Sequence, residues 1–91
     1  MADAAALART FKALAVESRV RIVRLLKERS LCVNALAARL GITPAAVSQH
    51  LRVLANAGLV RGRRRGYRVH YEINKATVRR WRKLIEGLLG P

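Results

Sequence analysis

A group of small, polar and cationic side chains between residues 43 and 52 has the chemistry needed for contacts with DNA. The Gln49 amide can form two hydrogen bonds with adenine, and an alanine can contact the methyl group of thymine. Hydroxyl and guanidinium groups can bind phosphate oxygens or base edges. We call these residues the recognition set: Thr43, Ala45, Ala46, Ser48, Gln49 and Arg52. Their types and spacing favour a surface that reads a DNA groove.

A cluster of arginines follows in the segment G-R-R-R-G, from Gly62 to Gly66. Three consecutive arginines repel one another unless an anion lies nearby, so we expect this segment to be exposed and to bind phosphate. The alternative is a loop that only keeps the protein soluble. We call the candidate phosphate-binding residues the arginine set: Arg61, Arg63, Arg64, Arg65 and Arg68.

Residues that support catalysis are few and dispersed. Cys32, His50 and His70 are the only cysteine and histidines, and their expected places on helices or a strand suggest no convergence. The five carboxylates form no pair at catalytic spacing, and no glycine-rich phosphate loop is present. We therefore expect neither an enzyme nor a bound cofactor.

The recognition set is expected on a helix over residues 43–57. Thr43 can cap this helix, and Pro44 suits its first position, where the missing N–H costs nothing. Gly58 tolerates the left-handed conformation that ends many helices. Apolar residues at helical spacing form an inward stripe of Val47, Leu51 and Leu54. The polar positions about half a turn away then point outward, although any amphipathic helix has a solvated face.

Three further helices are expected before this one. The first covers about residues 3–15, and the second begins near Glu17 with Ser18 or a neighbour as its cap. The third lies within residues 31–41 and ends at Gly41. A short helix joined by a glycine-containing turn to a second helix is the helix–turn–helix pattern, and the second helix of that pattern enters the major groove.

The pattern changes to a two-residue repeat after Gly58. Residues 67–73 alternate between apolar and polar side chains, which predicts a half-buried strand, and residues 59–61 are its expected partner. Residues 62–66 would then form the hairpin tip. A last helix starts near Asn74, a good cap. The expected order is helix, helix, helix, helix, strand, strand, helix, a mainly α fold with a small β-hairpin (α+β).

The first and last helices each carry an apolar ridge. In so small a protein such ridges pack either on their own core or on a second copy of the chain. We call these residues the terminal ridge: Leu7, Phe11, Leu14, Val78, Trp81, Ile85 and Leu88.

The order of elements and several motifs resemble the ArsR/SmtB family of small dimeric winged helix–turn–helix repressors. The resemblance covers residues 11–73 and is most specific over residues 48–60, which read S-Q-H-L-R-V-L-A-N-A-G-L-V. It implies a homodimer held together by the first and last helices. It also implies a 43–57 helix in the major groove and an Arg-rich wing over residues 61–68 on the flanking backbone or minor groove. The implied function is a repressor that binds an inverted-repeat operator.

One part of the family pattern is incomplete in this chain. Where many members carry a Cys-Val-Cys metal-binding core, this sequence reads Cys32-Val33-Asn34, and soft metals or arsenite require two or three thiolates. The alternative family site on the last helix uses Asp, His and Glu, and here only Glu86 is acidic. We therefore expect neither metal site and doubt a metal or small-molecule inducer. Cys32 is interpreted as a buried small hydrophobe, with a thiol sensor as the alternative.

The composition is consistent with a single DNA-binding domain over residues 1–91. Lys and Arg number 19 against 5 Asp and Glu, a net charge of +14, which favours a polyanion as partner. No apolar run has the length of a membrane span and no signal peptide is evident, so we expect a soluble, cytoplasmic protein. Two alternatives remain: a non-specific nucleoid or RNA-binding protein, and a winged-helix module that only binds proteins.

Overall fold

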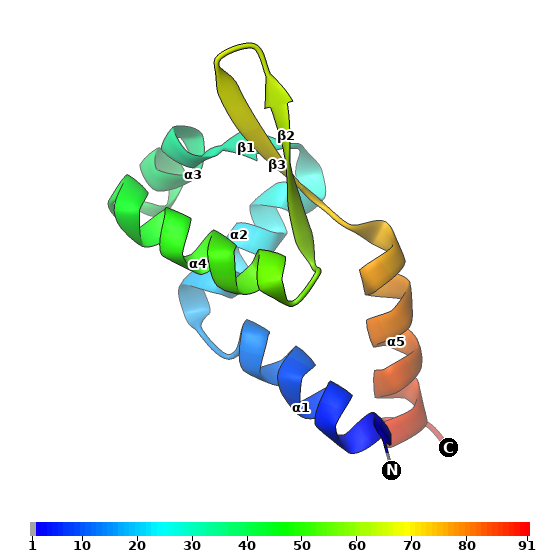
Figure 1. Cartoon of the computed structure of the whole chain (residues 1–91). Helices are drawn as coiled ribbons and strands as arrows, with labels where there is room; N and C mark the ends of the chain where they lie inside the picture. The colour runs from blue at the N-terminus through cyan, green and yellow to red at the C-terminus, as the bar shows by residue number, and fades with distance from the viewer. Residues whose placement is uncertain (1) are drawn as a thin grey trace.

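Five helices and a three-stranded antiparallel sheet make up the part of the chain that the computed structural model describes, residues 2–91, with side chains from Ala4 onward (Figure 1). The elements in chain order are α1 (Ala2–Leu14), α2 (Glu17–Glu28), β1 (Leu31–Cys32), α3 (Val33–Leu40), α4 (Pro44–Asn56), β2 (Val60–Arg65), β3 (Arg68–Ile73) and α5 (Lys75–Leu89). The expected mainly α fold with a β-hairpin is confirmed.

Local capping interactions explain where two of the helices begin. The Thr43 hydroxyl accepts a hydrogen bond from the Ala46 N–H at 3.1 Å, and the Asn74 side chain accepts one from the Ala76 N–H at 3.1 Å. Both predicted caps are therefore confirmed. The predicted start of the second helix near Glu17 is confirmed, but neither Ser18 nor a neighbour caps it through a side chain, because the residue at the cap position is Val16.

The core lies between α2, α3 and α4. The predicted stripe of α4 is confirmed, since Val47, Leu51 and Leu54 are 0%, 1% and 0% exposed. Ile22 of α2 and Leu36 of α3 are also completely buried. Full burial of such a side chain contributes about 1.5–3 kcal/mol, so this cluster holds α4 in a single orientation.

The short strand β1 is a departure from the predicted order. Leu31 pairs with Tyr71 and Cys32 pairs with His70, which places β1 beside β3 and gives the sheet order β1-β3-β2. The sequence pattern assigns residues 31–32 to the third helix instead. Two residues are too few to show an alternating pattern, and β1 forms because β3 offers a free edge.

The predicted hairpin tip at residues 62–66 is also wrong. β2 continues to Arg65, which pairs with Arg68, so the turn consists of Gly66 and Tyr67. Gly66 has φ +62°, as the first position of a two-residue hairpin turn requires. Tyr67 was expected on the half-buried face of the strand, and it is instead fully exposed at the tip.

The molecule is elongated, with extents of 44 × 23 × 20 Å. The β2–β3 hairpin projects from one end, whereas α1 and α5 pack together at the other end, where both termini lie (Figure 1). Among the described helices, none combines the length and the hydrophobicity that a membrane crossing requires.

Candidate nucleic-acid interface

The outer face of α4 presents the recognition set to solvent. Ala46 is half-buried, and the other five members are exposed. Five members lie on the same helix as the buried stripe, and Thr43 caps that helix, so the core fixes their orientation. The structure therefore places the recognition set on a rigid, solvent-accessible surface, as a groove-reading helix requires.

A tight turn connects α3 to α4. Gly41 ends α3 in the left-handed conformation with φ +69°, and its N–H donates to the Ala37 carbonyl at 2.9 Å. The chain then reaches Thr43, and α4 begins at the next residue. The predicted helix–turn–helix is thus present, with α4 as its second helix.

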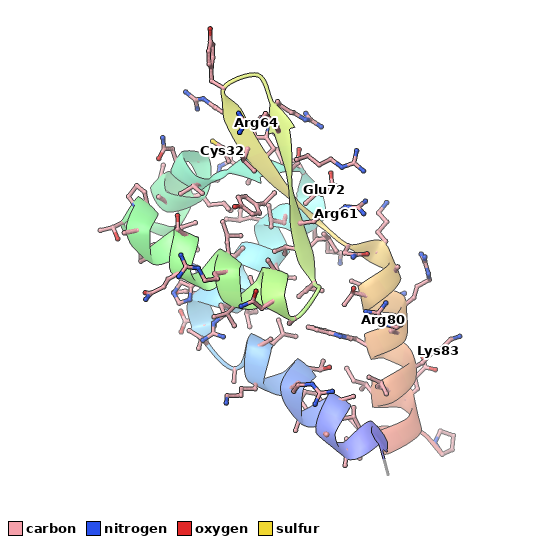
Figure 2. All side chains as sticks on the ribbon, in the orientation of Figure 1. Cys32, Arg61, Arg64, Glu72, Arg80 and Lys83 are labelled. Atoms are coloured by element: carbon pink, nitrogen blue, oxygen red, sulfur yellow. The ribbon has the colours of Figure 1, made fainter. Side chains whose placement is uncertain are left out.

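The sheet register divides the arginine set between two faces of the hairpin. Residues directly opposite each other in an antiparallel pair project to the same face. Arg61, Arg63 and Arg65 oppose Glu72, His70 and Arg68 respectively, so these six side chains share one face. Arg64 opposes Val69 and projects from the other face (Figure 2). The predicted exposure of the set is confirmed, but Arg63, Arg64 and Arg65, which were expected in the hairpin tip, lie on β2.

Glu72 pairs with two members of the arginine set. Its Oε2 lies 2.8 Å from Arg61 Nε and 3.0 Å from Arg63 Nε, near the base of the hairpin (Figure 2). The hydrogen bond from Arg61 lowers the pKa of the Glu72 carboxyl, and Arg63 acts in the same direction. Glu72 is therefore ionised at neutral pH and partly neutralises these two cations. No ion pair involves Arg64, Arg65 or Arg68 among the described side chains.

Cys32 lies beside the hairpin because β1 pairs with β3. Arg68 Nη1 donates to Cys32 Sγ at 3.7 Å, and the thiol is buried as predicted. The Ala35 N–H in the first turn of α3 lowers the pKa of the Cys32 thiol, burial raises it, and Arg68 lowers it again, so that the net change is downward. The described residues contain no cluster of three Cys, His, Asp or Glu able to hold a metal ion.

The terminal ridge is divided between the interior and the surface. Leu7 is 8% exposed, whereas Phe11 and Leu88 are 43% and 54% exposed. Leu14, Val78, Trp81 and Ile85 are half-buried. The helices α1 and α5 contact each other within one chain, so part of the ridge serves the chain's own packing.

Comparison with known proteins places these features in a family. Residues 17–61, which include α2, α3 and α4, match the family described as "Bacterial regulatory protein, arsR family". The match begins at the first residue of α2 and ends in β2.

Two curated proteins illustrate the similarity. A transcriptional repressor SmtB homolog from Synechocystis sp. is 42% identical over 67 residues, which are 74% of this chain and 51% of the relative. The transcriptional activator HlyU from Vibrio cholerae is 35% identical over 77 residues, which are 85% of this chain and 71% of the relative. The chain spans between about half and seven tenths of the length of these curated relatives.

A solved structure extends the similarity to the whole fold. The homodimeric winged helix–turn–helix DNA-binding domain of a possible ArsR-family regulator from Mycobacterium bovis is 33% identical, with a TM-score of 0.75. The match covers 91% of this chain and 77% of that one. All of these descriptions are of regulatory proteins rather than enzymes, which confirms that part of the prediction. The structure and the sequence together show that the chain belongs to the ArsR/SmtB family of winged helix–turn–helix regulatory proteins.

Proposed function

We propose that this chain is a homodimeric transcriptional repressor that binds an inverted-repeat operator. The observation that carries the proposal is the pairing, on one helix, of a completely buried stripe with the exposed recognition set. The buried stripe fixes the orientation of α4, and the outward side chains have the amide, hydroxyl, methyl and guanidinium groups that read base edges in the major groove. The adjacent hairpin then contacts the flanking backbone or minor groove.

The charge distribution supports DNA as the partner. The chain carries a net charge of +14, and the arginine set projects from the molecule on a thin two-stranded hairpin. Phosphate contacts of this kind position a protein on a duplex, whereas the contacts of α4 supply sequence preference. RNA-binding proteins usually stack bases on a platform of aromatic side chains. Here Tyr67 lies at the hairpin tip and Trp81 is half-buried in α5, so these two aromatic side chains do not form one platform.

Exposed apolar side chains on α1 and α5 support a homodimer. Phe11, Leu88 and Leu89 are 43%, 54% and 74% exposed, and burying such groups against a second copy is favourable. The related domain from Mycobacterium bovis is homodimeric. Two α4 helices related by a two-fold axis meet successive major grooves about 34–36 Å apart, so the operator is an inverted repeat.

Repression follows from occupancy of an operator by such a dimer. The curated relatives include both a repressor and an activator, and we propose repression for this chain. A DNA-binding regulator of this kind acts in the cytoplasm, where bacterial DNA is found.

Replacing Gln49 with alanine will remove base discrimination without a general loss of DNA binding. The amide is exposed on α4, and a bidentate amide–adenine contact is worth about 1–3 kcal/mol of discrimination. We expect the Gln49→Ala protein to lose about 5- to 150-fold preference at one base pair of each half-site. Binding-site selection on the purified protein, followed by affinity measurement on each single-base variant of the selected duplex, checks this result.

The matched control for this prediction is Arg64→Ala. Because Arg64 is expected to contact phosphate, its loss should weaken all duplexes by a similar factor and leave the base preferences unchanged. A Gln49→Ala protein with unchanged preferences at every position would refute the placement of α4 in the major groove. Equal affinity for random duplex or structured RNA would instead favour the non-specific alternatives.

Phe11→Arg will dissociate the proposed dimer. The change places a cation among exposed apolar groups of a chain that is already strongly cationic, and like charges brought together at an interface cost several kcal/mol. We expect the dimer dissociation constant, measured by sedimentation equilibrium, to rise at least about tenfold. Ala38→Arg, at an exposed position on α3, adds the same charge away from α1 and α5 and should leave the constant unchanged. An unaffected Phe11→Arg dimer would place the interface elsewhere.

A further inference from the structure

Glu72 is the only acidic residue in a long cationic stretch of the chain. No other Asp or Glu occurs between Glu28 and Glu86, a stretch that contains α3, α4, the hairpin and most of α5. The whole arginine set belongs to the same stretch. A carboxylate within a surface that binds a polyanion acts against binding through its charge. The effect of Glu72 therefore depends on the cations that it contacts.

One oxygen of Glu72 contacts two arginines of the neighbouring strand. Glu72 Oε2 lies 2.8 Å from Arg61 Nε and 3.0 Å from Arg63 Nε. Arg61 and Arg63 are two positions apart on β2, so their side chains project to the same face of the sheet as Glu72 on β3. Figure 2 shows Glu72 and Arg61 near the base of the hairpin. The carboxylate thus lies between two guanidinium groups that could otherwise bind phosphate.

The carboxylate keeps its charge at neutral pH. The hydrogen bond from Arg61 is the largest cause that lowers the pKa of the Glu72 carboxyl, desolvation opposes it, and the charges of Arg63 and Arg65 lower the pKa further. Glu72, Arg61 and Arg63 form a trio in which one negative charge offsets one of two positive charges. The base of the hairpin is therefore less cationic than its arginines alone would make it.

The arginines nearer the hairpin tip have no carboxylate partner. Arg64, Arg65 and Arg68 make no ion pair among the described side chains. Arg65 and Arg68 lie directly opposite each other, an arrangement in which like charges are unfavourable until an anion binds. The hairpin is thus divided into a tip with its full positive charge and a base in which Glu72 reduces it.

We propose that Glu72 is a specificity-determining residue, which limits the affinity of the hairpin for DNA of any sequence. Non-specific complexes form through whichever cations a duplex meets, and almost all of their affinity is electrostatic. The Debye length at 0.1 M salt is about 10 Å, so a phosphate bound to Arg61 or Arg63 is also repelled by Glu72. The carboxylate therefore weakens the contacts that the base of the hairpin would make with any duplex.

Operator binding is less sensitive to Glu72 than non-specific binding is. This step rests on the proposed function, in which the recognition set holds the operator in one position. A non-specific duplex can slide and turn until every available cation meets a phosphate. Without Glu72, the arginines of the base would gain contacts with a mobile duplex that a fixed operator does not offer. Glu72 thereby raises the ratio of operator affinity to random-duplex affinity, which decides occupancy among the competing sites of a genome.

Glu72→Gln is expected to raise the affinity for a duplex of random sequence. The glutamine side chain has nearly the same shape, and its amide oxygen can still accept a hydrogen bond from Arg61, so the charge is the main change. One additional phosphate contact steepens the salt slope by about 0.9, which is about eightfold in affinity between 1 M and 0.1 M salt. We expect the random-duplex affinity at 0.1 M salt to rise at least about eightfold, and the operator affinity to rise by less than about twofold. Fluorescence anisotropy with a selected operator and a scrambled duplex of equal length measures both values.

Matched variants separate the local effect of Glu72 from net charge and folding. Glu86→Gln makes the same charge change at an exposed position of α5, at the end of the molecule away from the hairpin, and should leave the ratio of the two affinities unchanged. Glu72→Asp keeps the charge and should keep the low random-duplex affinity. The double variant Glu72→Gln/Arg61→Gln restores the net charge of the trio and should return that affinity to the wild-type value. Thermal denaturation checks folding, to which an exposed ion pair contributes little.

The sign of the change in Glu72→Gln decides the proposal. A random-duplex affinity that stays the same or falls, or an equal rise for operator and random duplex, would overturn it. The measurement on random duplex requires no operator, so it tests Glu72 independently of the proposed function. Equal binding of both duplexes by the wild-type protein would overturn the proposed function. A wild-type preference for the operator that Glu72→Gln leaves unchanged would overturn only the role of Glu72.

Discussion

Raising the salt concentration from 50 to 200 mM will weaken DNA binding by a factor of about 10³–10⁵. Each phosphate neutralised by an arginine or lysine releases condensed counterions, so the logarithm of the affinity falls linearly with the logarithm of the salt concentration. The factor corresponds to roughly 6–10 phosphate contacts. Two copies of the arginine set on the two hairpins of a dimer, together with Arg52 on each α4, can provide contacts in this number. Fluorescence anisotropy of a labelled operator across a salt series measures the slope.

Substitutions within the arginine set should reduce this slope in a graded way. Arg64 and Arg65 lie on opposite faces of β2 and make no ion pair among the described side chains. Removal of either should therefore reduce the magnitude of the salt slope by about 1 for each phosphate that is no longer neutralised. Arg61 and Arg63 already share the Glu72 carboxylate, and their removal should matter less. A nearly flat salt response, or a slope that does not change with Arg64→Gln and Arg65→Gln, would remove the electrostatic part of the proposed mechanism.

Leu51→Ala will destabilise the protein by about 2–5 kcal/mol without touching the DNA-binding surface. Leu51 is 1% exposed and packs in the core that holds α4, so truncation leaves a cavity that the neighbours cannot fully close. A domain of this size has a free energy of unfolding of about 5–15 kcal/mol, so the loss is a large part of the total. Urea denaturation followed by circular dichroism checks the value.

Arg52→Ala is the matched control, because Arg52 is the next residue and is exposed on the outer side of the helix. Its removal should change the free energy of unfolding by less than about 0.5 kcal/mol and should weaken operator binding. The two variants thus separate the buried and exposed faces of α4. Equal destabilisation by both, or an unchanged operator affinity for Arg52→Ala, would contradict the assignment of these faces.

The elements that could be predicted are those in which local signals and hydrophobic spacing agree. The helix α4 has a capping Thr43, a Pro44 at its first position and a three-residue apolar stripe, and the structure reproduces all three. Asn74 likewise marks the start of α5. In these elements the capping bonds join residues close in sequence, and the helical spacing of the apolar residues marks the face that the core buries, so the local pattern is sufficient.

The elements that could not be predicted depend on contacts between distant residues. The strand β1 exists only because β3 pairs with it, and the contact between Arg68 and Cys32 joins residues 36 positions apart. The hairpin tip is misplaced by the sequence pattern because β2 continues through the arginines, where both faces of the strand carry charge.

The proposed mechanism depends most on α4 and the hairpin contacting one duplex together. Nuclear magnetic resonance mapping of the ¹⁵N-labelled protein with a selected operator tests this directly, with a duplex of scrambled sequence as the control. We expect the largest backbone and arginine side-chain shifts at residues 43–52 and 61–68, with the shifts at residues 45–52 reduced by the scrambled duplex and those of the hairpin retained. Shifts confined to α1 and α5, with the recognition set unaffected, would contradict the proposed interface.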